Sequence, residues 1–401
     1  MNTLQTLPAR AEGRAHEAAP PALAGVRVTV VSHGFQPNYE RGFVNGLASN
    51  RADVLLVGSD WTEHESLLPA VRMLNLRGSQ DPRRGALHKA VNLLTYHARL
   101  MALVALRRDR VVHVAGLLRP VLFCGLVEGL WFRVFARRYV LTVHNLLPHD
   151  RHTWVNRLLH RLAYRVPQRL VVHTHAMKRQ LAADYGVDPR HVVVMEHGIE
   201  PIDDTPLPAL GRGDEPLRIL FFGVLTGYKG LDLLLQALEC EVPEFRLHVA
   251  GLCTDAQLKA RTAQQIAAHP RASWIRWTEG FIDEAQVPGL FLDADVLVLP
   301  YRHIDQSGVL FQALRYGLPV IASRVGSFAD YVGPDIGLVC TPGDCGSLRA
   351  AICSYVGRRE RYSRERIRDR GRAFEWPRVS SVLARVYLTV PGGNQPGDPP
   401  L

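Results

Sequence analysis

Short, continuous runs of apolar and β-branched residues recur along the chain, and segments of helical length separate them. Because these runs are apolar throughout rather than alternating with polar residues, they predict strands of a parallel sheet that is covered on both faces. The first 200 residues contain seven such runs: VRVTVVSH, ADVLLVG, VRMLNL, VVHVAG, RYVLTVHN, RLVVHTH and HVVVMEHG. The helical segments expected between them are 87–106, 120–136, 153–166 and 175–186.

The pattern then breaks at IEPIDDTPLPALGRGDEPL (199–217), which is rich in Pro, Gly and Asp and marks a domain boundary. Six further strands follow: LRILFFG, FRLHVAG, WIRWTEGF, DVLVLPY, PVIASRV and GLVC. Helical segments at 229–240, 255–268, 283–293, 308–316 and 343–357 separate them. The sequence therefore predicts an α/β protein with two doubly wound, Rossmann-like domains.

The expected organisation has six parts. Residues 1–25 and 389–401 are expected to be a disordered lead and tail, because their composition is typical of disorder. The domains are placed at 26–200 and 217–373, joined by a linker at 201–216. A helix at 374–388 is expected to pack back on the first domain.

The composition is that of an ordinary globular protein, with 47% apolar and 21% charged residues in a chain of 401. The N-terminus lacks the apolar segment of a secretory signal. The most apolar stretch, 116–138, contains Arg119, Pro120, Glu128 and Arg133. We therefore expect a packed helix there and not a membrane-spanning one.

Charge is distributed unevenly between the halves. Residues 1–200 contain 26 Lys and Arg against 15 Asp and Glu, a net charge of +11, and the remainder has 22 against 23, a net charge of −1. A basic half could bind nucleic acid, an anionic membrane surface or a phosphorylated ligand. No basic stripe interleaved with aromatic residues supports nucleic acid, so none is expected as a partner.

Several cofactor motifs are absent from the sequence. No GxGxxG follows the first strand of either half, which argues against a nicotinamide or flavin enzyme. There is also no Walker loop, HExxH, GxSxG or metal-spaced Cys/His cluster. We expect neither a cofactor nor a metal ion.

The candidate chemistry lies in four loops that follow predicted strands. The first half contributes His33 in SHGFQPNYERG, and His144, Asn145 and Asp150 in HNLLPHD. His33 could instead bond a backbone carbonyl, and Asp150 could merely cap the next helix. Because ligands of doubly wound domains bind outside the carboxyl ends of the strands, these side chains are nevertheless candidate site residues.

The second half contributes Lys229 in VLTGYKG and the loop of DQSGVLFQAL (305–314). A lysine at the start of a helix is unfavourable, because the helix dipole is already positive there, and a bound anion would remove the conflict. Ser307 could be a plain N-cap, but the free N–H groups that follow it would also suit a phosphate.

Residues 217–238, 245–251, 293–332 and 337–352 resemble, in order and spacing, the glycosyltransferases of the GT-B fold, and most closely glycosyltransferase family 4 (group 1) with its bacterial exopolysaccharide members. LTVHNLLPHD and VVMEHGIEP in the first half are also similar. The resemblance spans 26 to about 388. It implies two Rossmann-like domains facing across a cleft, a nucleotide-sugar in the second and an acceptor on the first.

The resemblance also implies residue roles. Gly223 and Lys229 would lie at the donor diphosphate, Ser307, Gly308 and Val309 would offer it backbone N–H groups, Gln312 would contact the ribose, and His144 would lie beside the sugar and its phosphate.

The sequence departs from the family at two points. Val224 stands directly after Gly223 and no Arg precedes Lys229, so Arg302 or Arg324 would have to replace a missing cation. Gln312 replaces one glutamate of the paired motif, and Asp305 is the carboxylate nearest to the place of the other.

The expected function is sugar transfer from a UDP- or GDP-sugar to a polyprenyl-linked saccharide, in exopolysaccharide or related glycan synthesis. The expected location is the cytoplasm, at the inner face of an anionic membrane, where WFRVFARR (131–138) would suit the interface. Two alternatives stay open: another GT-B activity such as a sugar-nucleotide 2-epimerase, and a sugar- or nucleic-acid-binding protein without catalysis.

The resemblance favours retention of the anomeric configuration, with His33 positioning substrate. An inverting enzyme would need a general base at the acceptor hydroxyl, and His33, Asp150 or Asp305 could serve.

Overall fold

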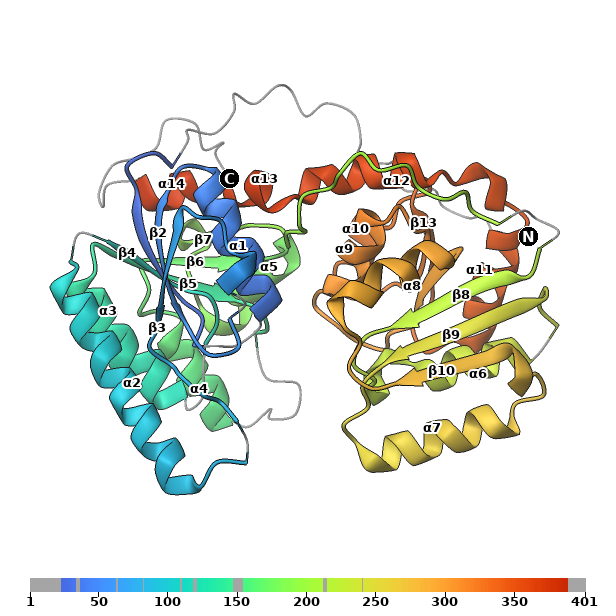
Figure 1. Ribbon diagram of the computed structural model, residues 1–401, viewed down its shortest axis with the longest axis horizontal. Coiled ribbons are helices and arrows are strands. Elements are labelled where there is room, and N and C mark those ends of the chain that lie inside the picture. The colour runs from blue at the N-terminus through green and yellow to red at the C-terminus, as the bar shows by residue number, and fades with distance from the viewer. Residues whose placement is uncertain are drawn as a thin grey trace. The chain divides into compact units, whose positions relative to one another are not determined.

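The computed structural model describes residues 23–33, 37–62, 64–81, 83–108, 110–117, 121–146, 154–211, 215–239 and 241–388. The chain divides into two compact units (Figure 1). The first unit contains the described residues from 23 to 200 and from 374 to 388, and the second contains those from 201 to 373. Residues 1–22 of the expected lead and the whole expected tail, 389–401, lie outside the described residues. The predicted end of the lead at residue 25 is wrong, because Leu23 is fully buried in a core of the first unit.

The first unit is built on a parallel seven-stranded sheet in the order β3-β2-β1-β4-β5-β6-β7. The predicted strands of the first half are all present: β1 Arg27–Val31, β2 Asp53–Gly58, β3 Val71–Asn75, β4 Val111–Val114, β5 Arg138–Val143, β6 Arg169–Val172 and β7 Val192–Val194. Successive residues of one strand enter different cores. Val111 packs in one cluster and Val112 in another, so the sheet is buried on both faces as its continuous apolar runs predict.

Helices cover both faces of this sheet. Residues of α1 share one core with residues of α13 and α14, and residues of α2, α3 and α5 contribute to the other. Helix α4 contacts α5 and the π-helical turn η2. The bounds are α1 Pro37–Ser49, α2 Ala86–Leu106, η2 Leu122–Val127, α3 Glu128–Phe135, α4 Trp154–Ala163, α5 His175–Tyr185, α13 Trp376–Ser380 and α14 Leu383–Leu388.

Within the apolar stretch 116–138, the described residues 122–135 form η2 and α3, which pack within the first unit as expected. A Cβ on Gly125 of η2 would lie only 2.8 Å from Ala163 of α4. No helix in the described part of the chain is long and apolar enough to cross a membrane.

The chain returns to the first unit at its C-terminal end. The N–H of Ile199 donates to the carbonyl of Phe374, and the N–H of Trp376 donates back to Ile199. The buried Trp376 then packs against α1, where a Cβ on Gly42 would overlap its indole ring. Glycine is required at Gly42 because the tryptophan occupies the space of a side chain.

The second unit contains a parallel six-stranded sheet in the order β10-β9-β8-β11-β12-β13. Its strands are the six predicted ones: β8 Leu217–Phe222, β9 Phe245–Gly251, β10 Ile275–Glu279, β11 Val296–Leu299, β12 Val320–Ser323 and β13 Gly337–Cys340. The helices are α6 Leu231–Glu239, α7 Ala256–Ala268, α8 Val287–Asp293, α9 Gly308–Arg315, α10 Phe328–Tyr331, α11 Cys345–Val356 and α12 Arg364–Gly371. In both sheets the strand order reverses beside the first strand, the arrangement of doubly wound folds.

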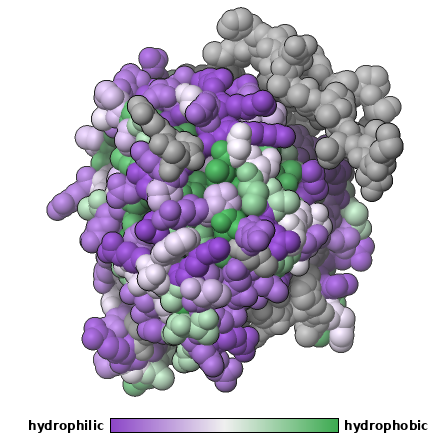
Figure 2. Space-filling model, turned by 90° about the vertical axis from the view of Figure 1, so that its right-hand side faces the viewer, coloured by the Kyte–Doolittle hydropathy of each residue, from purple (hydrophilic) through white to green (hydrophobic). Residues whose placement is uncertain are grey.

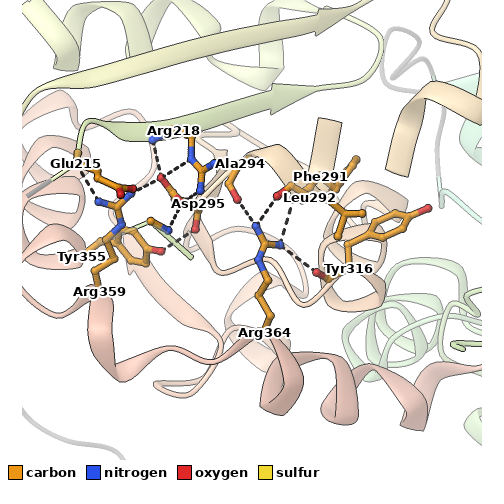
Figure 3. A network of polar contacts seen from close by, with 11 residues as sticks. Glu215, Arg218, Phe291, Leu292, Ala294, Asp295, Tyr316, Tyr355, Arg359 and Arg364 are labelled. Carbon is orange, nitrogen blue, oxygen red and sulfur yellow. Dashed lines mark hydrogen bonds and ion pairs between the residues drawn. The ribbon is translucent and has the colours of Figure 1, made fainter. Parts of the chain in front are cut away.

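A buried ionic network fixes the segment that leads into β11 (Figure 3). Asp295 is fully buried and accepts hydrogen bonds from Arg218 and Arg359. Arg364, also buried, donates to the carbonyl oxygens of Phe291, Leu292, Ala294 and Tyr316. These contacts hold the α8–β11 connection against α12, and so set where β11 and its following loop begin.

One face of the molecule, shown in Figure 2, is mostly hydrophilic, with smaller apolar areas between the polar side chains. Among the described residues of the second unit, Val224 and Phe281 are the large apolar side chains that are exposed.

Candidate active site

The loops after β8 and β11 bring predicted donor-binding residues together in the second unit. The two strands pair directly, and their carboxyl ends meet where the strand order reverses. A Cβ added to Gly223 would lie 2.9 Å from Lys229 Nζ and 3.4 Å from Val309 Cγ2. Gly223 has a φ of 102°, which favours glycine. The turn after β8 therefore brings the lysine ammonium against the Gly223 backbone, next to the start of α9.

Lys229 is a buried cation, 7% exposed, in the short turn Gly227–Lys229 that precedes α6. Burial lowers the pKa of its ammonium to about 8, and no carboxylate among the described residues offsets this effect. Its Nζ lies 5.6 Å from the centre of the Tyr301 ring, a weak compensation for lost hydration. A buried lysine without a paired carboxylate is the arrangement expected where an anion completes the site.

The start of α9 offers backbone donors on the same side of the sheet. Ser307 is the N-cap residue, but its side chain does not cap the helix. The N–H groups of Gly308 and Val309 have no backbone acceptor in the described structure, as is normal for a first helical turn. Such N–H groups together with a lysine are suited to a phosphate.

Buried polar atoms without hydrogen-bond partners are found in the same loops. Because buried polar groups are nearly always paired, these atoms call for a ligand or water. Four of them follow the central strands or lie on α9: Thr226 Oγ1, Gln306 Nε2, Gln312 Oε1 and Ser327 Oγ. The free amide oxygen of Gln312 could accept a hydrogen bond from a hydroxyl, as the resemblance to the family implies.

Two other predicted donor residues have protein partners. Both terminal nitrogens of Arg302 contact Asp232, at 2.9 and 2.7 Å, and one also donates to the Gly227 carbonyl. This arginine therefore braces the Lys229 turn from outside. The backbone carbonyl of Asp305 accepts from the N–H of Ser327, which joins the β11 and β12 loops.

Arg324, the other candidate for the missing cation, follows β12 and is exposed. Because Arg302 is engaged by Asp232, Arg324 is the better placed of the two to meet a ligand.

In the first unit, His144 lies at the end of β5 in a group of histidines. Its Nε2 lies 2.5 Å from the Ala115 carbonyl oxygen, and its Nδ1 lies 3.1 Å from His173 Nε2. His197 and Tyr39 complete the group, with the Tyr39 ring centre 4.5 Å from that of His144. Burial lowers the pKa of His144 to about 4 and that of His197 to about 4. These histidines are therefore neutral at pH 7 unless a nearby anion raises their pKa values.

His173 was not among the predicted site residues. Val143 pairs with Val172 in the sheet, so the residues that follow them, His144 and His173, come side by side. Both strands end in histidine in the sequence, as TVHN and VVHTH. The sequence signal that could have identified His173 was a histidine directly after each of these two strands.

His33 lies in a second, buried polar group of the first unit. Its Nδ1 lies 2.7 Å from the Tyr96 hydroxyl and its Nε2 lies 3.8 Å from Glu128, with His97 on the other side of that carboxylate. Only 2% of His33 is exposed, and burial lowers its pKa despite Glu128. Both ring nitrogens of His33 therefore face protein side chains.

Asn145, the neighbour of His144, is exposed at the end of β5. Asp150 lies outside the described residues, between 146 and 154.

A cavity of about 300 Å³ in the second unit lies elsewhere. Arg218, Arg246, Trp274 and Ala294 line it, near the amino ends of β8, β9 and β11. Ligands of doubly wound domains bind at the opposite ends of the strands, so this cavity is not part of the candidate site.

Comparison with known proteins agrees with this geometry. Residues 216–357, which carry the whole Gly223–Gln312 site, match the family model described as "Glycosyl transferases group 1". The chain has the GT-B fold, and its second unit is a group 1 glycosyltransferase domain. The predicted fold class is thereby confirmed, and the predicted family is matched over residues 216–357. The structure of Anabaena HepE in complex with UDP matches with a TM-score of 0.66 and 14% identity, over 90% of this chain and 99% of that one.

Two relatives are more similar in sequence. A D-inositol 3-phosphate glycosyltransferase of Geodermatophilus obscurus is 32% identical over 238 residues, 55% of this chain and 52% of the relative. A GDP-mannose:glycolipid 4-beta-D-mannosyltransferase of Xanthomonas campestris pv. campestris is 26% identical over 63% of this chain and 69% of the relative. The chain thus aligns with about half of the first relative's length and about two thirds of the second's.

Proposed function

We propose that the protein transfers a sugar from a nucleotide-sugar donor to a saccharide acceptor. The observation that carries this proposal is the buried Lys229, which has no paired carboxylate and faces Gly223 beside the first turn of α9. In the reaction the bond between the anomeric carbon and the donor phosphate breaks. A bond to the acceptor oxygen forms, and the acceptor hydroxyl loses its proton.

The main electrostatic need of this reaction is to stabilise the departing diphosphate. The Lys229 ammonium and the N–H groups of Gly308 and Val309 supply positive charge in a place shielded from water, where it acts strongly. Holding the acceptor hydroxyl near the anomeric carbon supplies much of the remaining rate. None of these steps requires a resident cofactor.

The nucleotide is proposed to be UDP or GDP. The unpaired Gln312 oxygen supports a contact to a ribose hydroxyl. The names of the relatives support either base, because one structural neighbour was solved with UDP and one relative is described as using GDP-mannose.

The acceptor is proposed to be a polyprenyl-linked saccharide of exopolysaccharide or related glycan synthesis, used at an anionic membrane. The name of the Xanthomonas relative, which acts on a glycolipid, supports a lipid-linked acceptor. Support from this chain comes from the first unit, where α2, η2–α3 and α4 expose apolar side chains. These helices contact one another, since α2 meets α3 and η2 meets α4. We name them the three-helix surface.

Each helix of the three-helix surface shows apolar residues at helical spacing. On α2 these include positions 87, 91 and 94, each separated from the next by three or four residues. The exposed large apolar residues of the surface are Leu87, Val91, Leu94, Leu106, Leu122, Val127, Leu130, Val134, Trp154, Val155, Leu158 and Leu162.

The charge of the three-helix surface is one-sided. Glu128 is its one acidic residue among those described, and it is fully buried. The exposed charges are therefore basic, for example Lys89, Arg99, Arg133, Arg157 and Arg161. Apolar stripes flanked by basic residues suit an interface with anionic lipid. The predicted WFRVFARR segment covers only part of this surface.

We propose that the anomeric configuration is retained. The burial of His33 supports this choice, because a general base must come within about 2.6–3.2 Å of the acceptor hydroxyl. NMR of the product's anomeric proton decides between the outcomes, and a β-linked product from an α-linked donor would contradict retention.

The experiment for the function itself is a panel of UDP- and GDP-sugars incubated with and without saccharide acceptors. Acceptor-dependent release of UDP or GDP together with a longer saccharide supports the proposal. Conversion of the donor to another sugar nucleotide would identify an epimerase instead. Binding without turnover would leave the non-catalytic alternative.

A further inference from the structure

Asp232 is a carboxylate close in sequence to the lysine of the candidate site, but its partner is an arginine of another loop. It is the second residue of α6 and follows Lys229 by three positions. Its two oxygens accept from the two terminal nitrogens of Arg302, at 2.9 and 2.7 Å. No carboxylate among the described residues acts on the pKa of Lys229. Asp232 therefore leaves the lysine without a counter-ion and contacts the loop after β11 instead.

Arg302 is also bound to the turn that carries the lysine. Its backbone N–H donates to the Tyr228 carbonyl at 2.7 Å, and its guanidinium donates to the Gly227 carbonyl at 2.8 Å. One arginine thus holds two backbone carbonyls of the turn and the carboxylate of Asp232 at the same time. The loop after β11, the turn and the start of α6 are joined at this point.

The turn also packs directly on the backbone of that loop. Gly230, the residue after Lys229, has a φ of 71°, which favours glycine. A Cβ on Gly230 would overlap the carbonyl oxygen of Pro300. Because the turn lies this close to the loop, a shift of one against the other would move the Lys229 ammonium away from Gly223.

The pair of Asp232 and Arg302 is charged but adds little to stability. Burial alone raises the pKa of Asp232, but the hydrogen bond and charge of Arg302 outweigh it and lower the pKa below its usual range. The side chains of Arg302 and Asp232 are 38% and 46% exposed. Pairs that are this exposed contribute little to the free energy of folding. The protein should therefore fold without the pair, and any effect should appear in the position of the turn.

On charge alone, Asp232 is unfavourable for the proposed ligand. The donor diphosphate is an anion, and a negative charge three residues from Lys229 works against its binding. The carboxylate also occupies Arg302, a cation that could otherwise turn to the ligand. If charge were its only effect, Asp232→Asn would strengthen donor binding.

We propose that Asp232 is a positioning residue for sugar transfer, which acts through Arg302 to fix the turn that carries Lys229. This inference rests on the proposed function, in which Lys229 binds the donor diphosphate. Asp232 holds the guanidinium in the direction in which it also reaches the Gly227 carbonyl. The ammonium is thereby kept beside Gly223 before the donor arrives, so that donor binding does not have to order the turn.

The first test is calorimetric titration of the natural protein and of Asp232→Asn with UDP-glucose and GDP-mannose at pH 7. The variant keeps the shape of the side chain and loses its charge. Donor affinity should fall by about three- to fivefold, which is what an exposed ion pair of this kind can supply. A rise in affinity would show that Asp232 contributes only its charge.

A second comparison shows whether Asp232 acts through Lys229. Asp232→Asn is repeated in the Lys229→Ala background, where the position of the turn no longer matters for the diphosphate. Affinity should then change by less than about 1.5-fold, because the two residues belong to one coupled arrangement. An acidic residue in a first helical turn can also stabilise the helix through its dipole. Loss of that effect would weaken donor binding equally in both backgrounds.

Arg302→Lys distinguishes a positioning arginine from a cation that binds the ligand. Lysine keeps the charge but cannot hold two carboxylate oxygens and a carbonyl in one fixed plane, so affinity should fall as it does in Asp232→Asn. A cation that contacts the diphosphate directly would be replaced by lysine with little loss. Asp335→Asn is the matched control, because this exposed aspartate pairs with Arg370 elsewhere in the second unit. Its donor affinity should equal that of the natural protein.

The outcomes separate this inference from the proposed function. Unchanged or tighter donor binding in Asp232→Asn, or an equal loss in both backgrounds, overturns the positioning role and leaves the proposed function standing. If the donors do not bind the natural protein, or bind Lys229→Ala equally well, the proposed function and this inference fall together.

Discussion

The ammonium of Lys229 lies 2.9 Å from the point that a Cβ on Gly223 would occupy. The residue after β8 and the turn before α6 thus share a space that admits a lysine head group only if the residue at 223 has no side chain. In the proposed function this contact sets where the donor diphosphate meets its cation.

A methyl group at Gly223 should therefore impair donor binding and turnover. Gly223→Ala must displace the ammonium and also adopt a φ of 102°, which costs about 1–3 kcal/mol for residues other than glycine. We expect kcat/KM to fall by at least about tenfold, which corresponds to about 1.4 kcal/mol. Gly227→Ala is the control in the same loop, because a Cβ there meets nothing within 4 Å. Equal activities of the two variants would contradict this role of Gly223.

Removing the lysine head group tests the site directly. Lys229→Ala should lower kcat/KM by about 2–4 kcal/mol of transition-state stabilisation, the usual loss for one strong electrostatic contact. Unchanged turnover in a folded variant would show that the lysine has no part in catalysis.

The charge of Lys229 should also make donor affinity depend on pH. Burial lowers its pKa to about 8, so the donor-free ammonium is lost as the pH rises through that value. Donor affinity should then fall above pH 8, and calorimetric titration between pH 7 and pH 9.5 measures it. Lys229→Arg keeps its charge over this range, so its affinity should not show the fall. An identical decline in this variant would assign the pH dependence to another group.

Most of the fold can be predicted from the local sequence pattern, whereas the partners and neighbours of each site residue cannot. Continuous apolar runs require burial on both faces of a sheet, and every predicted strand is present for that reason. The pairing of Arg302 with Asp232 could not be inferred from the sequence, because it depends on how the loop after β11 packs against α6. The neighbour of His144 was missed because strand order, and not sequence distance, brings His173 beside it.

Breaking the ionic network before β11 should destabilise the second unit. Burial alone raises the pKa of Asp295, but hydrogen bonds from Arg218 and the charge of Arg359 outweigh it and lower the pKa below its usual range. Its contribution is therefore present above the unfolded pKa near ~3.9 and is lost as the pH falls through the lower folded value. Asp295→Asn removes the buried carboxylate that Arg218 and Arg359 share, and should cost about 3–5 kcal/mol. Urea unfolding measures it.

Asp293→Asn is the control for the network, because this carboxylate lies two residues away and is exposed. If both variants lose a similar amount of unfolding free energy, the buried network contributes no more to stability than the exposed carboxylate does.

The last prediction concerns the three-helix surface, whose exposed charges are all basic among the described residues. Arg157 and Arg161 lie one turn apart on α4, beside Leu158 and Leu162, so the charge and the apolar stripe should meet a bilayer together. Sedimentation should show tighter binding to phosphatidylglycerol vesicles than to phosphatidylcholine vesicles, weakening with salt because surface charges are screened beyond about 8–10 Å. The double variant Arg157→Glu/Arg161→Glu should lose most of this binding. Arg261→Glu/Arg276→Glu changes the net charge equally with exposed arginines of the second unit, and should bind nearly as the natural protein does. If both double variants lose binding to the same extent, the attraction is one of overall charge and the three-helix surface is not the docking site.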